Sequence, residues 1–307
     1  MNNSEILYIY DAQMCNPNGD PDEENRPRMD YATQTNLVSD VRLKRYIRDY
    51  LQSLGHALYV SKGDSGEVVN ASRRIMQVLG KEKATKLAKN DLDTLLEKLV
   101  DIRLFGATIP IQREGQEKGQ SIAFTGPVQF NWGYSLNRVY LLDSQTITSH
   151  FSSGEDRDQG TMGKDFRIKY SILAFHGVIS SFNAKHTHLS ETDVALLDKA
   201  MIKSIPLHAT RSKIGQEPRL YLRVEYNSDD FILGDFRKWI ICENADNKKD
   251  EEIFSAKDII LNLEKLVETL NLKRDHIAKC VIWQDKVINV RGKLDNLPKL
   301  IPLSMQE

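Results

Sequence analysis

Apolar residues recur along the chain with two different periods, and each period predicts a different kind of element. The run Ile6–Tyr10 is continuously apolar, which is typical of a buried strand. Apolar and polar residues alternate from Phe166 to Ile172, within a strand expected to run to Ile179, and again from Leu220 to Tyr226, which is the spacing of an amphipathic strand. Further strands are predicted at Ser121–Tyr134, Arg138–Ser149 and Cys280–Gln284.

Helical spacing is clearest after residue 39, where Ser39 or Asp40 can cap a helix. Its apolar stripe is Leu43, Ile47, Tyr50, Leu51 and Leu54. Two further helices are predicted at Ala71–Leu79 and Asp91–Val100, and Gly106 would end the second of these in the left-handed conformation. Another helix is predicted from a capping box at Ser190–Asp193 to about Ile205. The last is predicted from a second cap at Ser255–Asp258, through Ile259 to Leu270. This order of elements predicts an α+β fold, in which helices pack on an antiparallel sheet.

The helix after Ser39 is strongly basic on one side. Lys44, Arg45 and Arg48 fall opposite the apolar stripe, and Arg42 lies at its border. The preceding loop is rich in turn formers from residue 16 to residue 21 and carries Arg26 and Arg28 on either side of a proline. A strand followed by an irregular loop and a cationic helix start is a layout suited to binding a polyanion. The alternative is that these cations form the solvated face of an ordinary surface helix.

Composition limits the classes of protein to consider. The chain has 307 residues, of which 40% are apolar, so it can bury a sizeable core. Its net charge is −1, which counts against a protein that is basic throughout. The cations are nevertheless clustered, with six basic against three acidic residues from Arg26 to Asp49 and five against one from Lys203 to Arg223. Local patches of this kind can neutralise phosphates.

Targeting and redox features are sparse. The longest apolar runs fall far short of the roughly 20 residues of a membrane helix, so no membrane partner is expected. The N-terminal segment has no basic region and no cleavage-like site, so no signal peptide is predicted. Cys15, Cys242 and Cys280 are widely spaced, which predicts neither a disulfide framework nor a zinc site. A cytoplasmic location fits this pattern.

An ordered series of motifs resembles a known family. The loop NPNGDPD…RPRMD, which leads into SDVRLKRYIRDYL, is followed by DIRLFG at residue 101 and FTGPVQF at residue 124. The series continues with MGK at residue 162, His176-Gly177 and ATRSKIGQEPRLYLRVEY at residue 209. These segments, from about residue 5 to about residue 226, resemble the CRISPR-associated backbone subunits of type I Cascade complexes, with the type I-B branch nearest and type I-C related.

The resemblance implies a fold and a division of the chain. Family members have a ferredoxin-like, RRM-related core called the palm, elaborated by fingers and a protruding thumb. Residues 1–307 would then form a single domain. By position, the fingers would lie within about residues 55–120 and the thumb within about residues 145–166.

The resemblance also implies which residues bind RNA. Lys44, Arg45 and Arg48, with Arg42 beside them, match the basic palm helix under the crRNA. The other matching positions are Asn18, Arg26 and Arg28 in the neighbouring loop, Arg211 and Lys213 in the later basic turn, and Met162 and Lys164 in the thumb. Met162 and Phe151 are apolar thumb residues suited to a wedge between bases, and packing in a core or hinge is the alternative for both.

The function implied is a non-catalytic subunit that polymerises along one crRNA for antiviral DNA targeting. Arg and Lys side chains grip phosphates without reading bases, which suits a guide of arbitrary sequence. The partners implied are crRNA, target DNA paired to the guide, further copies in a helical filament, the subunit that caps the 5′ end, the large subunit, the small subunits and a recruited helicase-nuclease. No cofactor is implied.

Other chemistry is less well supported by the sequence. Asp20, Asp22, Glu23 and Glu24 lack the EF-hand spacing, and His186 and His188 have no third metal ligand that the sequence can name. The segment from residue 160 to Lys164 departs from a phosphate loop because Asp165 follows the lysine. No metal site or catalytic residue is therefore predicted.

Two rival functions remain open from the sequence. Related backbone subunits of type III complexes cleave RNA with an aspartate of the first loop, and Asp20, Asp22 and Asp30 occupy that loop here. The motifs match the type I branch, whose members lack that activity. A free single-stranded RNA-binding protein that works outside any complex is the third interpretation.

Overall fold

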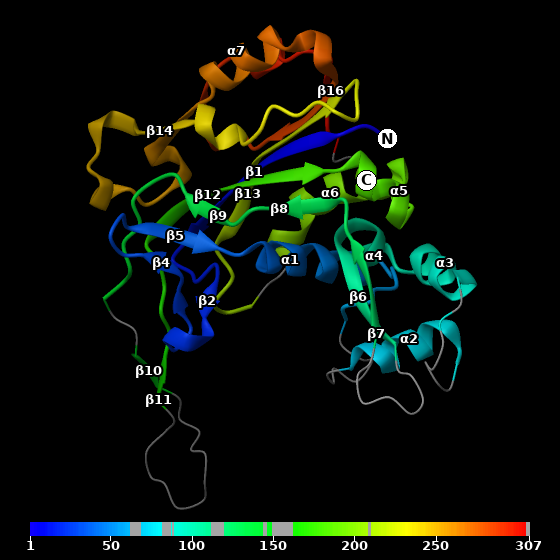
Figure 1. The fold of residues 1–307 in the computed structure, drawn as a ribbon. Coiled ribbons are helices and arrows are strands. Elements are labelled where there is room, and N and C mark those ends of the chain that lie inside the picture. The colour runs from blue at the N-terminus through cyan, green and yellow to red at the C-terminus, as the bar shows by residue number, and fades with distance from the viewer. Residues whose placement is uncertain are drawn as a thin grey trace, which may run out of the picture.

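The computed structural model describes residues 1–61, 69–81, 87, 89–111, 120–143, 146–148, 162–207 and 210–304. Its centre is a nine-stranded sheet in which β1, β12 and β13 are the longest strands (Figure 1). The order of neighbours is β18-β16-β13-β1-β12-β9-β5-β4, and β8 also pairs with β12. The strands are β1 Ser4–Gln13, β4 Met29–Asp30, β5 Thr35–Val38, β8 Val128–Phe130, β9 Gly133–Ser135, β12 Tyr170–Ile179, β13 Gln216–Tyr226, β16 Ile277–Gln284 and β18 Leu300–Pro302.

Strand β1 runs antiparallel to both of its neighbours. Ser4 lies opposite Ile179 of β12 and Glu225 of β13, and each pairing continues toward the other end of β1. The strand is buried along almost its whole length, as its apolar run predicts. The predicted strands at Leu220–Tyr226 and Cys280–Gln284 are confirmed as parts of β13 and β16, whereas the strand predicted from Phe166 to Ile179 begins only at Tyr170, as β12.

Helices cover one face of this sheet. Helix α1 spans Asp40–Ser53, and α6 spans Glu191–Leu207. Both pack with alternate residues of β1 in one buried cluster, which includes Tyr8, Leu43 and Leu197. The predicted caps are confirmed, since the Ser39 side chain accepts a hydrogen bond from Arg42 N, and Ser190 and Asp193 bond reciprocally. Short helix α5, Ser181–Thr187, lies between β12 and α6 in the chain.

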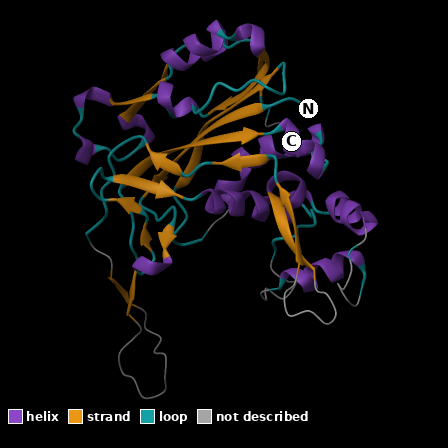
Figure 2. Cartoon of the chain, in the orientation of Figure 1, coloured by secondary structure: helices purple, strands orange, loops and turns teal. Residues whose placement is uncertain are grey.

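The C-terminal region covers the opposite face, where Leu7 and Ile9 of β1 join a second cluster. Figure 1 shows α7, Glu264–Leu272, across the sheet from α1. A three-stranded sheet in the order β14-β15-β17 belongs to this layer (Figure 2). Its strands are Ile241–Asn244, Ile259–Asn262 and Asn289–Arg291, and single 3-10 turns lie at Phe236–Trp239, Ala245–Asn247, Asp250–Glu252, Ala256–Asp258, Arg274–His276 and Leu294–Asn296.

A separate small core lies between α1 and β8 in the chain. Helices α2, Ala71–Leu79, and α3, Lys89–Lys98, pack with the β6–β7 hairpin around Ile75, Leu95 and Ile109. Helix α4 is Val100–Phe105, and the hairpin strands are β6 Gly106–Ile111 and β7 Gln120–Thr125. In Figure 1 this lobe lies below the sheet on the right. The paired strands β10, Thr146–Thr148, and β11, Met162–Lys164, project from the sheet at the lower left.

Several predicted boundaries were wrong. The helix expected from Ile259 to Leu270 is a strand followed by α7, because Ile259, Leu261 and Leu263 also fit a period of two and face the core. The strand expected at Ser121–Tyr134 is divided into β7, β8 and β9. At residue 126 a Cβ would lie 2.0 Å from the Phe105 carbonyl carbon, so only glycine fits this break.

Two further expectations were also wrong. The helix expected at Asp91–Val100 is split into α3 and α4, and the Gly106 that follows has φ 75° and ψ 177°, outside the left-handed helical region. The strand expected at Arg138–Ser149 is reduced, among the described residues, to β10 and one bridge from Leu141 to Ile168. No helix within the described ranges is long and apolar enough to cross a membrane.

Candidate nucleic-acid interface

Four segments that are distant in sequence meet at the end of β1. Beyond this strand, Asn16 N donates to Ser212 O at 2.9 Å, and Ile168 N donates to Cys15 O at the same distance. The backbone dihedral φ of Gly215 is 100°, and a Cβ at this position would lie 2.3 Å from Gln13 O. The turn therefore requires glycine. Backbone hydrogen bonds therefore hold the 14–28 loop, the 210–215 turn and the segment before β12 together.

The fourth segment is the start of α1, which Asn18 attaches to the loop. Its Oδ1 accepts hydrogen bonds from the Ser39 backbone N at 2.9 Å and from Ser39 Oγ at 3.0 Å. Arg28 N donates to the Asn18 carbonyl, also at 3.0 Å. The predicted site residue Asn18 thus positions both the first turn of α1 and the backbone of Arg28.

Arg42 and Lys213 bring two cations together at the centre of this junction. Nε and Nη2 of Arg42 are buried and make no hydrogen bond with the described residues. The Arg42 guanidinium lies 4.0 Å from the centre of the Tyr46 ring. Lys213 Nζ donates a hydrogen bond to the carbonyl oxygen of Asn16. Among the described residues, no carboxylate forms an ion pair with this lysine. An anion placed here would find donors that the protein itself leaves unpaired.

The electrostatics of this junction disfavour the charge on Lys213. Burial, followed by repulsion from Arg42, lowers the pKa of Lys213 from 10.5 to about 8. Burial also raises the pKa of the Cys15 thiol to about 12, so this neighbour adds no negative charge at neutral pH. A phosphate beside Lys213 would favour the charged amine and so raise its pKa.

Arg26 and Arg28 lie at the edge of the junction. Arg26 stacks over the buried Phe166 ring at 4.7 Å. Arg28 Nη1 donates to Asp20 Oδ2 at 2.8 Å, and its guanidinium lies 5.7 Å from the Trp132 ring centre. Both side chains are held by stacking on aromatic rings, which leaves part of each cation exposed.

Two other predicted cations are exposed and make ion pairs. Arg211 Nη1 lies 3.3 Å from Asp165 Oδ2, and Lys164 Nζ lies 2.7 Å from Glu24 Oε2. The Lys164 pair is exposed on both sides and contributes about 0–1 kcal/mol, whereas Asp165 is largely buried and also pairs with Arg167, so only the Arg211 side of that pair is open to a phosphate. Arg167, which the sequence reading missed, donates to the Met14 and Arg211 carbonyls and fixes this edge.

The basic side of α1 differs from the sequence prediction. Lys44 is 9% exposed and donates to Asp40 and Gln129, and Arg48 donates to Asp101 at 3.1 Å. Arg45 is the more open cation, with an ion pair to Asp49 at 2.8 Å. The expectation of an open basic side was wrong for Lys44 and Arg48, because residues from α4 and β8 cover them. Leu54 is also 51% exposed and leaves the apolar stripe.

The later basic patch is likewise smaller than its composition indicates. Arg219 pairs with Asp11 at 2.9 Å, and Arg223 pairs with Asp198 at 2.7 Å. Both guanidinium groups are buried within the sheet layers, so they satisfy internal carboxylates. Only Arg211 and Lys213 of this patch reach the junction.

Some predicted thumb residues cannot be placed in the same detail. Phe151 lies outside the described residues, as does most of the 149–165 segment. Met162 belongs to β11, where its backbone pairs with Thr148.

The alternative metal sites gain no support. Within the described ranges, no group of three or more His, Cys, Asp or Glu side chains could hold a metal ion. Asp20 accepts from Arg28 and from Asp22 N, and Asp30 accepts from Ala32 N and Thr33. His186 lies on α5, and His188 caps the end of that helix.

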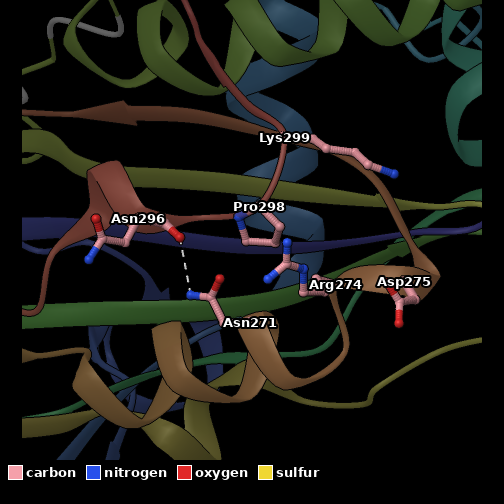
Figure 3. A pocket seen from close by; sticks show the side chains of 6 residues that line it. All are labelled: Asn271, Arg274, Asp275, Asn296, Pro298 and Lys299. Carbon is pink, nitrogen blue, oxygen red and sulfur yellow. Dashed lines mark hydrogen bonds between the residues drawn. The ribbon is translucent and has the colours of Figure 1, made fainter.

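A larger hollow of about 470 Å³ lies elsewhere, at the end of α7 (Figure 3). Its lining residues are Asn271, Arg274, Asp275, Asn296, Pro298 and Lys299. Asn271 donates to the Asn296 carbonyl at 3.1 Å, and Lys299 donates to Ile277 O at 2.7 Å. Because β16 begins here beside the end of β13, this hollow lies at the opposite end of the sheet from Arg42.

The fold and the junction define an α+β protein with a sheet covered on both faces and a cluster of cations at one end. A family model described as CRISPR-associated protein Cas7 matches residues 2–264. A Haloferax volcanii protein named CRISPR-associated protein Cas7 is 38% identical over 295 residues, which cover 90% of this chain and 85% of that protein. The chain belongs to the Cas7 family.

Solved structures share the fold. A chain in a structure titled "CRISPR RNA-guided surveillance complex, pre-nicking" aligns with a TM-score of 0.56 at 13% identity, over 95% of this chain and 96% of that chain. A chain from a "CRISPR RNA-guided surveillance complex" aligns with a TM-score of 0.55 at 14% identity, over 98% and 94%.

Proposed function

We propose that this chain is a non-catalytic backbone subunit that binds crRNA and polymerises along it in a type I Cascade complex for antiviral DNA targeting. The observation that carries the proposal is the half-buried pair of Arg42 and Lys213, which has no anionic partner among the described residues. Membership of the Cas7 family supports the same function. The order of motifs in the sequence favours the type I-B branch.

The RNA would follow the junction at the end of β1. Arg42 and Lys213 would hold one phosphate, and Arg26, Arg28 and Arg211 would contact its neighbours. Lys164 and Met162 would act from the β10–β11 projection, whereas Asn18 would act by positioning α1. Lys44 and Arg48 would contribute mainly by fixing α1, because internal oxygens already accept their hydrogen bonds. Arg45 would add an exposed charge.

The parts of the hand can be assigned from this arrangement. We take β1, α1, β9, β12, α6 and β13 as a ferredoxin-like palm, since the strand order β13-β1-β12-β9 and the helices on one face fit that topology. The lobe with its own core around Ile75 would be the fingers. The β10–β11 projection would be the base of the thumb. Residues 1–307 would form one domain.

Repetition of the subunit follows from the shape of its ligand. A single-stranded guide presents the same backbone at regular intervals, so identical subunits bound head to tail form an open helical filament. The further partners would be target DNA paired to the guide, the 5′-end-capping subunit, and the large and small subunits, in the cytoplasm.

Cleavage of RNA by a first-loop aspartate is the rival. Its test is incubation of the assembled complex with complementary RNA and Mg²⁺, using Asp20→Ala, Asp22→Ala and Asp30→Ala variants. We expect intact RNA with every protein. Regular cleavage that one of these variants abolishes would establish the enzyme instead.

The main experiment is purification of the protein expressed with and without its crRNA, at several salt concentrations. We expect a ladder of protein on one protected RNA, longer on longer RNA and dissociating at high salt. One chain per RNA, without lengthening, would favour a free RNA-binding protein. A monomer that binds no RNA would overturn the proposal.

A further inference from the structure

The hollow at the end of α7 lies beside the start of β1. Tyr226 N donates to Asn3 O at 3.0 Å, and the next residue, Asn227, donates from its backbone N to His276 O at 2.9 Å. These bonds attach the 274–276 turn, which contributes to the hollow, to this end of the strand. The hollow therefore opens at the end of the sheet that is farther from the proposed RNA path.

Two cations and one carboxylate line this hollow, so it is cationic. Arg274 and Lys299 outnumber Asp275 there (Figure 3). In the part of the chain that the structure describes, no carboxylate pairs with either cation, and Lys299 Nζ donates to the Ile277 carbonyl. Lys299 has φ 49°, a backbone conformation that lysine rarely adopts. Leu272, which precedes Arg274 by two residues, is 75% exposed.

An acidic turn, residues 250–254, lies at the opposite end of β1. Gln13 Nε2 donates to Phe254 O at 2.7 Å, and Lys169 Nζ donates to Glu251 O. Phe254 is 42% exposed. Like Leu272 beside the hollow, this ring is a large apolar group next to exposed charge.

Glu251 is the free acid of this turn. Asp250 accepts a hydrogen bond from Asn244 Nδ2 at 2.9 Å, and Glu252 accepts one from Lys249 N at 2.8 Å. The Glu251 side chain is exposed, and none of the described residues pairs with its carboxylate. The turn thus presents a negative charge that the fold itself leaves without a partner.

The two surfaces are complementary, but one molecule cannot bring them together. Strand β1 has ten residues, which separate its ends by about 30 Å. A second copy displaced along β1 would bring the acidic turn of one molecule to the hollow of the other. Such a contact uses different surfaces on its two sides, so it can continue from copy to copy. The apolar side chain beside each charge favours a protein surface over a nucleic acid as the occupant.

We propose that the hollow at the end of α7 receives the acidic turn of a second copy of this chain, with Glu251 of one copy paired to Arg274 of the next. The inference rests on the proposed function and names a contact by which copies on one RNA adjoin. A guanidinium and a carboxylate form a charge-assisted, often bidentate pair, which fixes the orientation of the two copies. Phe254 and Leu272 would pack beside this pair.

The test uses the full-length protein and oligouridine RNAs, namely the shortest that binds one copy and others two and three times as long. Filter binding on the shortest RNA measures RNA affinity alone. Analytical ultracentrifugation on the longer RNAs measures how much more tightly a second copy binds beside the first. For the wild type we expect an advantage of at least about tenfold for the second copy.

Charge reversals separate the contact between copies from RNA binding. Arg274→Glu and Glu251→Arg each place like charges in the contact, so each should remove most of the advantage. Their affinity for the shortest RNA should stay within about twofold of the wild type. The double variant pairs opposite charges again and should restore the advantage to within about threefold. Lys265→Glu reverses an exposed charge of α7 outside the hollow and is the matched control, expected to behave as the wild type.

Several outcomes would overturn the inference and leave RNA binding intact. One is a wild type that shows no advantage for the second copy, and another is a full advantage in both single variants. If the double variant failed to rescue two weakened single variants, each charge would have a different partner. Weaker binding of Arg274→Glu to the shortest RNA would identify the hollow as a nucleic-acid site. Failure of the wild type to bind any of the RNAs at low salt would remove the proposed function together with the contact.

Discussion

Lys213 is a cation that the fold holds where its charge reduces stability. Its folded pKa of about 8 lies below the ordinary value of 10.5, mainly because the amine is buried. The unfolded chain therefore binds the proton more tightly, and the penalty is fully present below pH 8. A group retained at such a cost is typical of a binding site.

Lys213→Met should make the RNA-free protein more stable at pH 7, by about 1 kcal/mol, because the lost bond to the Asn16 carbonyl offsets part of the gain. Urea denaturation measures the change. Lys203→Met, on the exposed side of α6, is the matched control and should stay within about 0.5 kcal/mol. The Lys213 variant should nevertheless bind RNA more weakly. Unchanged RNA affinity would remove Lys213 from the site.

RNA binding should also depend on pH through this lysine. Phosphates favour the charged amine, so binding near pH 8–9 should take up protons, and affinity should fall as pH rises above about 8. Calorimetry in buffers of different ionisation enthalpy measures the proton uptake. The uptake should disappear in Lys213→Met. Equal uptake by both proteins would place the titrating group elsewhere.

At the scale of elements, α1 shows how a helical pattern can be correct and its exposure wrong. Spacing identified the stripe of Leu43 and Ile47, and Ser39 capped the helix as expected. The pattern could not show that Gln129 and Asp101 approach the opposite side, because these residues are far away in sequence. The helix is consequently covered on more of its circumference than its own residues indicate.

The arginines of α1 should therefore differ on replacement. Arg48→Ala leaves Asp101 buried with only the Tyr59 and Val60 backbone donors, and should cost about 1–3 kcal/mol. Arg45→Ala removes an i,i+4 surface pair and should cost less than about 0.5 kcal/mol. Thermal unfolding compares them. Equal costs would contradict the burial of the Arg48 pair.

Salt dependence provides the matching measurement on RNA. From the sequence alone, replacing Lys44, Arg45 and Arg48 by alanine predicts a loss of up to roughly three phosphate contacts. The structure leaves Arg45 as the open cation, so we expect the slope to fall by no more than about one contact. Arg42→Ala should by itself lower the slope by about one. A fall of the salt-dependence slope by about three phosphate contacts in the triple variant would instead show that Lys44, Arg45 and Arg48 all contact the RNA.

At the scale of the whole molecule, the C-terminal layer completes the core. The family match ends at residue 264, whereas most of α7 and all of β16 and β18 follow that position. Strand β16 pairs with β13 in the main sheet, and Leu270 packs among residues of the second face. The layer therefore contributes to the stability of the main sheet as well as to the outer surface of the protein.

This layer predicts a contrast between two neighbouring leucines. Leu270 is fully buried, and Leu272 is 75% exposed. Leu270→Ser should destabilise the whole protein by about 3 kcal/mol or more, because it combines a cavity with a buried hydroxyl, while Leu272→Ser should have little effect. Urea unfolding followed by tryptophan emission measures both. Local loss of α7 with an intact main transition would show that the layer is dispensable.

The sequence by itself determined the features that depend on nearby residues. β1, β13, α1 and α6 were predictable because a period, a cap and an apolar run lie within a few turns of chain, and the ordered motifs indicated the family. The region from Ile259 to Leu270 failed because two periods overlap there, and only pairing with β14 and β17 selects the strand. Tertiary structure alone decided which cations are free. Ion pairs join residues brought together by the sheet, so Arg219 and Arg223 are neutralised, while Arg42 and Lys213 meet without a described carboxylate partner.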